Sequence, residues 1–281
     1  MPQLTNVEFS ALVFVGSFVA GLLGALTGLG GGIVVIPMLT LLFGVDIRYA
    51  AGAALISVVA TSSAAASSYV KEGFSNLRVG MLLEVATTCG AVAGALVTGY
   101  ISANAIAMIF GVVLLFSAVL SLRKHEDHAA TDTPDPLAVR LRLDSDYPTP
   151  NGRVAYHVHG IPPAFGLMFV AGGLSGLLGI GSGAVKVLAL DRAMRLPFKV
   201  STTTSNFMIG VTAAASAGVY LERGYIDPGL AMPVMLGILI GALLGARILT
   251  RVQSRALRVV FAVAIAALGV QMIYGSLHGM P

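Results

Sequence analysis

Ten runs of apolar residues, separated by short polar stretches, follow one another along this chain of 281 residues. They lie at 7–28, 32–44, 49–70, 78–101 and 104–122, and then at 163–179, 183–195, 200–221, 228–250 and 256–276. The third, fourth and fifth run of each set hold about 20 residues, enough for a helix to cross a hydrocarbon layer of about 30 Å. The pattern predicts an all-α polytopic membrane protein.

The second run of each set is too short to cross. In the first set this run reads "GIVVIPMLTLLFG" and would rise only about 20 Å as a helix. Glycines that weaken a helix stand directly before it. We therefore expect the first and second runs of each set to form a helical hairpin that dips into the membrane and returns, with the glycines at its tip.

The two sets of runs are copies of one unit. Shifted by 151 residues, the chain aligns with itself without a gap from Phe14 and Phe165 onward over about a hundred positions. Matching glycines are Gly21/Gly172, Gly28/Gly179, Gly30/Gly181, Gly32/Gly183, Gly90/Gly241 and Gly94/Gly245. Chance matching between two glycine- and alanine-rich stretches is the alternative, but so long a gapless match favours a repeat. We predict a first repeat at 1–123, a linker at 124–161 and a second repeat at 162–281.

The linker differs sharply in composition from the repeats. It holds six of the thirteen acidic residues and four of the five histidines of the chain, which indicates an aqueous and partly disordered loop. The histidines are His125, His128, His157 and His159. They could bind a metal ion, although such spacing is common in solvated loops.

The charges of the loops predict how the repeats are oriented. The hairpin returns to the side from which it starts, so each repeat crosses the membrane three times. Because three is odd, the second repeat must be inverted relative to the first. Lysine and arginine collect in short cytoplasmic loops. They follow the third run in the first repeat, at Lys71 and Arg78, but follow the fourth run in the second repeat, at Arg251 and Arg255. Both chain ends are then expected outside the cell, and the linker in the cytoplasm.

The composition limits the class of function. Hydrophobic residues make up 56% of the chain, charged residues make up 11%, and the mean hydropathy is +0.88. These values exclude a soluble globular domain. A single cysteine, Cys89, excludes a disulfide framework. The sequence shows no motif for a catalytic nucleophile, a catalytic metal or a nucleotide. We therefore expect a transporter that has no cofactor, is not an enzyme and does not bind nucleic acid.

The two glycine tips are the candidate substrate site. Inverted repeats with broken helices are typical of secondary transporters, whose sites lie at mid-membrane. Helix N-termini and close backbone approach at glycines favour an anion there. The candidate tip residues are Gly28, Gly30, Gly31 and Gly32 in the first repeat and Gly179, Gly181, Ser182 and Gly183 in the second.

Polar side chains near the tips strengthen the interpretation as an anion site. Lys186 follows the second tip and could be the counter-charge of the substrate. It could equally pair with Asp191 or extend to the interface. Thr61, Ser205 and Asn206 could donate to the anion, although such residues also bond neighbouring helices.

Two further features have both a functional and a structural interpretation. Glu84 and Asp191 could carry a coupling proton, whereas an ion pair or a shallow position would explain them structurally. Four glycines in G-x-x-x-G patterns, Gly90, Gly94, Gly241 and Gly245, favour close helix packing and could form a homodimer face.

The motifs "GLLGALTGLGGGIVVIPML" and "GLSGLLGIGSGAVKVLALDRAMRLPFKVSTTTSNFMIGVTAAASAGVY" resemble the TauE/SafE sulfite exporter family of bacterial membrane permeases. The resemblance implies an eight-helix transporter in the bacterial plasma membrane. It also implies small sulfur-containing anions, such as sulfite, thiosulfate, sulfoacetate or sulfolactate, moved by a proton-coupled or gradient-driven route. Ala53 and Ala54 depart from the Thr-Ser often found in related sequences.

These observations together predict a secondary transporter, and specifically an exporter, of a small sulfur-containing oxyanion. Two other functions stay open at this point. One is a divalent-metal permease that collects its ion with the linker histidines, and the other is a membrane scaffold or sensor that transports nothing.

Overall fold

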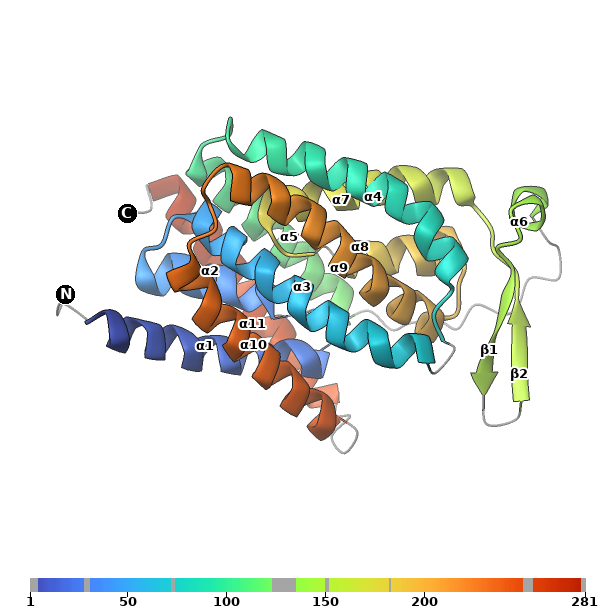
Figure 1. Ribbon diagram of the computed structural model, residues 1–281, viewed down its shortest axis with the longest axis horizontal. Helices are drawn as coiled ribbons and strands as arrows, with labels where there is room; N and C mark the ends of the chain where they lie inside the picture. The colour runs from blue at the N-terminus through green and yellow to red at the C-terminus, as the bar shows by residue number, and fades with distance from the viewer. Residues whose placement is uncertain are drawn as a thin grey trace.

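The computed structural model describes residues 5–27, 31–71, 74–122, 135–149, 152–181, 183–249 and 255–278 (Figure 1). The first half holds helices α1 (Asn6–Thr27), α2 (Gly32–Phe43), α3 (Ile47–Lys71), α4 (Leu77–Thr98) and α5 (Ala103–Leu122). The linker holds α6 (Pro136–Arg140) and strands β1 (Ser145–Thr149) and β2 (Gly152–Tyr156). The second half holds α7 (Ile161–Leu178), α8 (Gly183–Leu188), a π-helical turn (Ala189–Ala193), α9 (Phe198–Glu222), α10 (Pro228–Leu249) and α11 (Arg255–His278).

The helices bear out the prediction of an all-α polytopic membrane protein. Within the described residues, five helices are long and apolar enough to cross a bilayer, namely α1, α4, α5, α7 and α10. The second element of each half is short, with 12 residues in α2 and 6 in α8. The first helices are longer than a limb that only dips into the membrane requires, with 22 residues in α1 and 18 in α7.

The helices run so that both ends of the chain lie at the same end of the bundle. In Figure 1, α1 begins and α11 ends at the left, whereas the β-hairpin lies at the right. Helices α1 and α7 start from opposite ends of the bundle and run in opposite directions. This arrangement is the one expected of inverted repeats, although the position of the membrane itself stays a prediction.

Equivalent helices of the two halves make equivalent contacts. Helix α1 packs along α10 and α7 packs along α4, and these two pairs exchange under the 151-residue offset. Individual glycine contacts are equivalent in the two pairs as well. A Cβ added at Gly172 would overlap the carbonyl oxygen of Thr87, and a Cβ added at Gly21 would overlap the carbonyl oxygen of Ile238. Thr87 and Ile238 are themselves equivalent positions. These paired contacts favour the predicted inverted repeat.

The G-x-x-x-G glycines pack within the chain. Gly90 and Gly94 of α4 lie against the backbone of Phe169 and Gly173 on α7, and Gly241 of α10 lies against the backbone of Phe18 on α1. Gly245 is also buried. These glycines therefore allow close packing between α4 and α7 and between α10 and α1, as small residues do in membrane helices. Helices of the same chain contact Gly90, Gly94 and Gly241, and a homodimer face at these positions stays a prediction.

The described part of the linker, residues 135–149 and 152–160, is folded, which corrects the expectation of a loop. Asp135 caps α6 through a 2.9 Å hydrogen bond from the Leu137 N–H to its carboxylate. Strands β1 and β2 pair antiparallel, and Arg153 donates to Asp146 across them at 2.7 Å. The hydrogen bond from Arg153 holds the pKa of Asp146 below its ordinary value.

Buried contacts fasten the hairpin to the start of α4. The Asn76 side-chain amide donates to the Leu143 carbonyl and to the Tyr156 hydroxyl, each at 2.9 Å. Burial in this contact raises the pKa of the Tyr156 hydroxyl above its ordinary value. Leu143 and Tyr156 belong to one apolar cluster with Leu83 of α4 and Met168 of α7. The linker is therefore docked on the helix bundle.

Candidate functional site

The second glycine tip interrupts the helix through left-handed backbone conformations. Gly179 ends α7 with a φ of 73°, and its N–H donates to the Ser175 carbonyl at 2.8 Å. Gly181 follows with a φ of 70°. Side chains rarely adopt these angles, which explains the glycines here. Gly28, Gly30 and Ser182 lie outside the described residues.

Neighbouring helices supply partners for backbone groups that the break leaves free. The Tyr220 hydroxyl, from α9, donates to the Leu177 carbonyl at 3.1 Å, and the Thr98 hydroxyl, from α4, approaches the same oxygen at 3.4 Å. Tyr220 is completely buried. Irregular backbone is tolerated at membrane depth when its polar groups find such partners inside the protein.

The two tips approach each other inside the bundle, between α3 and α9. A Cβ added at Gly32, the first residue of α2, would lie 3.8 Å from the Gly179 carbonyl oxygen. A Cβ added at Gly181 would lie 3.3 Å from Val58 of α3 and 3.0 Å from Ile209 of α9. Gly31 and Gly183 are buried as well. The described glycines of both breaks are therefore surrounded by protein.

Lys186 stands one turn after the second tip and is 0% exposed. Its ammonium nitrogen donates to the Thr212 hydroxyl of α9 at 2.5 Å. A lysine that extends to the interface keeps its charged end in water, so complete burial excludes that explanation. The structure thus holds an ammonium group in the interior of the bundle, one turn along the chain from the second glycine break.

Glu84 of α4 is linked to this lysine through Thr212. The Thr212 hydroxyl donates to Glu84 Oε1 at 2.7 Å, and the Thr88 hydroxyl donates to the same oxygen at 3.0 Å. Glu84 is 8% exposed, and its other oxygen, Oε2, has no hydrogen-bond partner among the described residues. Lys186, Thr212 and Glu84 form one polar chain, named here the Lys–Thr–Glu chain, that joins α8, α9 and α4.

The polar chain has no charged counterpart in the other half of the molecule. Under the 151-residue offset Lys186 corresponds to Val35, Thr212 to Thr61 and Glu84 to Met235. Thr61 only bonds its own helix, donating to the Ser57 carbonyl at 2.9 Å. Of these two sets of equivalent positions, one therefore carries a lysine and a glutamate and the other carries apolar residues in their place.

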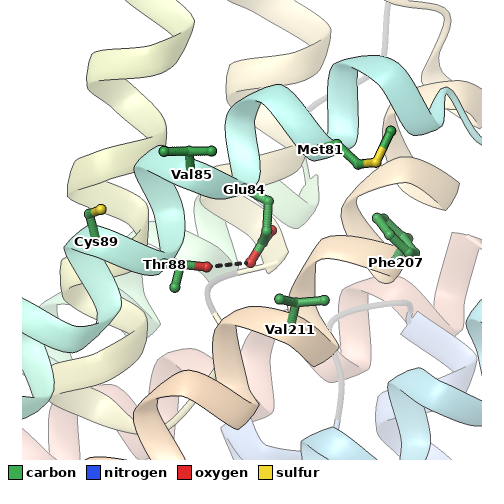
Figure 2. Close-up of a pocket in the computed structure, with 7 residues that line it drawn as sticks. All are labelled: Met81, Glu84, Val85, Thr88, Cys89, Phe207 and Val211. Carbon is green, nitrogen blue, oxygen red and sulfur yellow. Dashed lines mark hydrogen bonds between the residues drawn. The ribbon is translucent and has the colours of Figure 1, made fainter.

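A groove of about 430 Å³ lies between α4 and α9 and opens at the outer side of the bundle. Its walls are mostly apolar, and Figure 2 shows Glu84 pointing into it from α4 towards α9, with Thr88 bonded to its carboxylate. The lining residues are Met81, Glu84, Val85, Thr88, Cys89, Phe207 and Val211. Cys89, the single cysteine, is exposed there.

The remaining predicted site residues are distributed over the second half. Ser205 is buried on the same face of α9 as Thr212, and its hydroxyl has no hydrogen-bond partner among the described residues. Asn206, next to it, is half-buried. Asp191 lies buried in the π-helical turn after α8. Lys186 donates to Thr212 and Thr212 donates to Glu84, so the polar chain leads from the lysine to Glu84.

The histidines that the structure describes do not gather into a metal site. His157 lies 3.0 Å from an Asp144 oxygen, and the described part of the chain contains no group of three or more histidine, cysteine or acidic residues able to hold a metal ion. His125 and His128 lie outside the described residues.

A comparison with protein families matches the model named "Sulfite exporter TauE/SafE" to residues 13–272. The chain belongs to the TauE/SafE family. Since this is a family of membrane transporters, the protein is a multi-pass membrane transporter and not an enzyme, as predicted.

Curated relatives cover nearly the same length. The chain is 25% identical to the probable membrane transporter protein YunE of Bacillus subtilis, over 95% of this chain and 98% of that protein. It is 25% identical to the probable membrane transporter protein MJ0441 of Methanocaldococcus jannaschii, over 93% of this chain and 94% of that protein. No solved structure matches the chain.

Sequence reasoning found Lys186 and Glu84 separately but missed the contact through which they are joined. Thr88 was not a candidate, although its i, i+4 spacing from Glu84 places both on one helix face and is a usable signal. Thr212 is one of several hydroxyl residues of α9, and no local pattern distinguishes it from the others. Only the relative placement of α4, α8 and α9 shows that it bonds both charged residues.

Proposed function

We propose that this protein is a secondary transporter that exports small sulfur-containing oxyanions, such as sulfite, thiosulfate or sulfonates. The observation that carries the proposal is the completely buried ammonium group of Lys186 one helical turn after the second glycine break, whose Gly179 lies near Gly32 of the first. A charged side chain inside a membrane protein is unfavourable by several kcal/mol unless it serves a partner, and such residues mark substrate and ion pathways. The family name supports sulfite and related anions as the partner.

The proposed binding site uses the glycine tips and the hydroxyls around them. Oxyanions of sulfur accept several hydrogen bonds at once, and charge-assisted bonds from an ammonium are the strongest of these. Glycines let backbone N–H groups approach the anion closely. The proposed contacts are Gly28, Gly30, Gly31, Gly32, Gly179, Gly181, Ser182, Gly183, Lys186, Thr61, Ser205 and Asn206. Among these, the buried hydroxyl of Ser205 has no partner within the part of the chain that the structure describes and is a donor for a ligand.

The proposed orientation follows from the loop charges. We place the protein in the bacterial plasma membrane with both chain ends outside and the linker in the cytoplasm, since the basic loops lie towards the linker end. The docked hairpin then stands on the cytoplasmic side, where export begins.

Flux measurements in proteoliposomes test the function. Liposomes that contain the protein are loaded with sulfite, thiosulfate, taurine or sulfoacetate, and efflux is followed across an imposed proton gradient. Wild type is expected to move at least one of the three anions, sulfite, thiosulfate or sulfoacetate, faster than empty liposomes, and zwitterionic taurine tests whether net charge is required. Lys186→Met is expected to lower that flux by about tenfold or more, since a lost charge-assisted contact exceeds about 1.4 kcal/mol.

A matched control separates the site from the general effect of losing a lysine. Lys199→Met removes an exposed lysine at the start of α9, outside the proposed site, and should leave the flux within about twofold of wild type. The site assignment is wrong if Lys186→Met carries every anion as well as Lys199→Met does. The proposed substrate class is wrong if wild type carries none of them.

A further inference from the structure

We infer that Glu84 is the resident counter-ion of Lys186 and that an anion bound at Lys186 drives proton uptake by Glu84. The inference rests on the proposed function, because it assumes that the transported anion binds at this lysine. It makes Glu84 the proton acceptor and Thr212 the link between the proton and the anion, roles that anion binding alone does not require.

The first support is the geometry of the Lys–Thr–Glu chain. The Thr212 hydroxyl accepts from Lys186 and has a single proton to give. Two acceptors lie within reach of that proton, Glu84 Oε1 at 2.7 Å and the Met208 carbonyl at 2.9 Å. While Glu84 is ionised, the hydroxyl donates to it. When Glu84 is protonated, its own O–H donates to Thr212 and the hydroxyl turns to Met208. Thr212 therefore has a partner in both states.

The second support is the balance of charge. Lys186 and Glu84 together are neutral when both are ionised, so the free site holds a compensated pair. A monovalent anion that binds Lys186 leaves one negative charge without compensation in the bundle interior, which is strongly unfavourable. One proton taken up by the Glu84 carboxylate restores neutrality. Each monovalent anion is thus bound together with one proton.

The third support is the position of Glu84 relative to Lys186. The Oε2 atom of Glu84 is buried and has no hydrogen-bond partner among the described residues, so a proton added to the carboxylate breaks no bond of that oxygen. Glu84 lines the groove between α4 and α9 (Figure 2), whereas Lys186 is bonded to Thr212 from α8. Proton and anion then bind at two positions that communicate through one hydroxyl.

Few other ionisable groups could take over this role. Helix α7, which packs along α4, has no ionisable side chain, and the groove itself adds only the Cys89 thiol. The other ionisable groups on elements packed around α4 are Lys186 on α8, Asp191 and Arg192 in the π-helical turn, and Lys199, Tyr220 and Glu222 near the two ends of α9. Arg78 lies on the first turn of α4 itself, where the docked linker adds Arg142 and Tyr156. Glu84 is the carboxylate that the polar chain connects to Lys186.

Anion binding to the purified protein at several pH values tests the inference. The probe is methanesulfonate, a monovalent sulfonate whose charge does not change in this range. Its apparent Kd is measured by titration calorimetry, and proton uptake is measured with a pH indicator in weak buffer. Wild type should take up about one proton per anion, and its Kd should rise about tenfold per pH unit where Glu84 is ionised.

Three variants make the expectation specific. Glu84→Gln should bind methanesulfonate without proton uptake and with a Kd that changes less than about twofold per pH unit. Glu84→Asp keeps a carboxylate and should keep the uptake, which shows that the effect follows the carboxylate. Glu222→Gln removes an exposed carboxylate at the far end of α9 and should behave as wild type.

Thr212 is a positioning residue, and its variants test the link. Thr212→Ser keeps the hydroxyl and should keep the pH slope, whereas Thr212→Val should bind the anion with a slope reduced at least about twofold. The inference is overturned if wild type binds methanesulfonate without proton uptake, or if Glu84→Gln takes up as many protons as wild type. If wild type binds neither methanesulfonate nor sulfite nor thiosulfate, the proposed function itself fails and the inference falls with it.

Discussion

Replacing Gly172 by alanine should destabilise the protein through one helix contact. Gly172 lies on α7, and a Cβ added there would overlap the Thr87 carbonyl oxygen and lie 2.8 Å from the Thr87 Cα atom of α4. Ordinary van der Waals contact begins near 3.4 Å. Both obstacles are backbone atoms, which cannot rotate away. The two helices must therefore move apart by more than about 0.6 Å.

The expected magnitude follows from this separation. A gap of about 0.5–1 Å removes a quarter to a half of the dispersion energy of each affected contact, and overpacked substitutions cost about 1–3 kcal/mol. For a protein of this size each kcal/mol shifts Tm by about 2–4 °C. We expect Gly172→Ala to lower the Tm of the detergent-purified protein by several degrees. Thermal loss of the monodisperse peak in size-exclusion chromatography is the assay.

Gly166 is the control on the same helix. It has no atom within 4 Å of an added Cβ, and the equivalent position of the first repeat holds Val15, which is exposed. Gly166→Ala should therefore keep or raise Tm, because alanine is better than glycine in a helix by up to about 1 kcal/mol. Gly21→Ala, the equivalent of Gly172 in the first repeat, should lower Tm as well. Equal Tm values for Gly166→Ala and Gly172→Ala would refute the reasoning.

Two further predictions concern the linker and the orientation. The hydrogen bond and ion pair with Arg153 lower the pKa of Asp146 in the folded hairpin. The stabilisation of the hairpin by this pair is therefore present above about pH 4 and is lost as pH falls through the lowered pKa. The β1 amides of Arg153→Gln should exchange hydrogen faster than those of wild type above this range, and the difference should vanish below it. In a chain without its native cysteine, Tyr100→Cys should react with an impermeant thiol reagent from outside the cell and Val154→Cys only from inside, and labelling of both from one side would contradict the orientation.

The helices could be predicted from the sequence because burial in lipid leaves a long and simple pattern. A membrane span needs about 20 apolar residues without a charge, and α4 and α5 follow their runs to within three residues at each end. Glycine marked the ends of α2 and α7 equally well, since Gly44 and Gly179 both adopt left-handed conformations. These features are local, so a local pattern is sufficient to predict them.

The linker shows where a local pattern was misread. Its charges and prolines suggested a loop, yet a few apolar side chains order the described part. Leu143 and Tyr156 pack against α4 and supply the apolar contacts that hold the hairpin. The alternating residues Leu137, Val139 and Leu141 are exposed, and the first two lie in α6, so the period of two in this segment is not the signal. Composition averaged over the whole linker hid the few buried residues.

The candidate site could be predicted only in parts, because its geometry depends on contacts distant in sequence. Thr212 and Glu84 are 128 residues apart and come from different repeats. Each was visible as a polar residue in an apolar run, but no local pattern tells which polar residues of α4, α8 and α9 face one another. The repeat itself was no guide either, because Val35 and Met235 stand where a symmetric copy would have charges.

That asymmetry has a mechanical consequence for the proposed transporter. Glu84 belongs to the first repeat, whereas Lys186 and Thr212 belong to the second, so the polar chain crosses from one repeat to the other. Alternating access in inverted-repeat transporters moves one part of the bundle against another, which must lengthen this chain. With Glu84 ionised, lengthening separates two buried opposite charges and is opposed by their attraction. With Glu84 protonated and an anion on Lys186, the same movement separates two neutral groups. The chain therefore opposes movement of the empty, unprotonated site more strongly than movement of the site that holds both proton and anion.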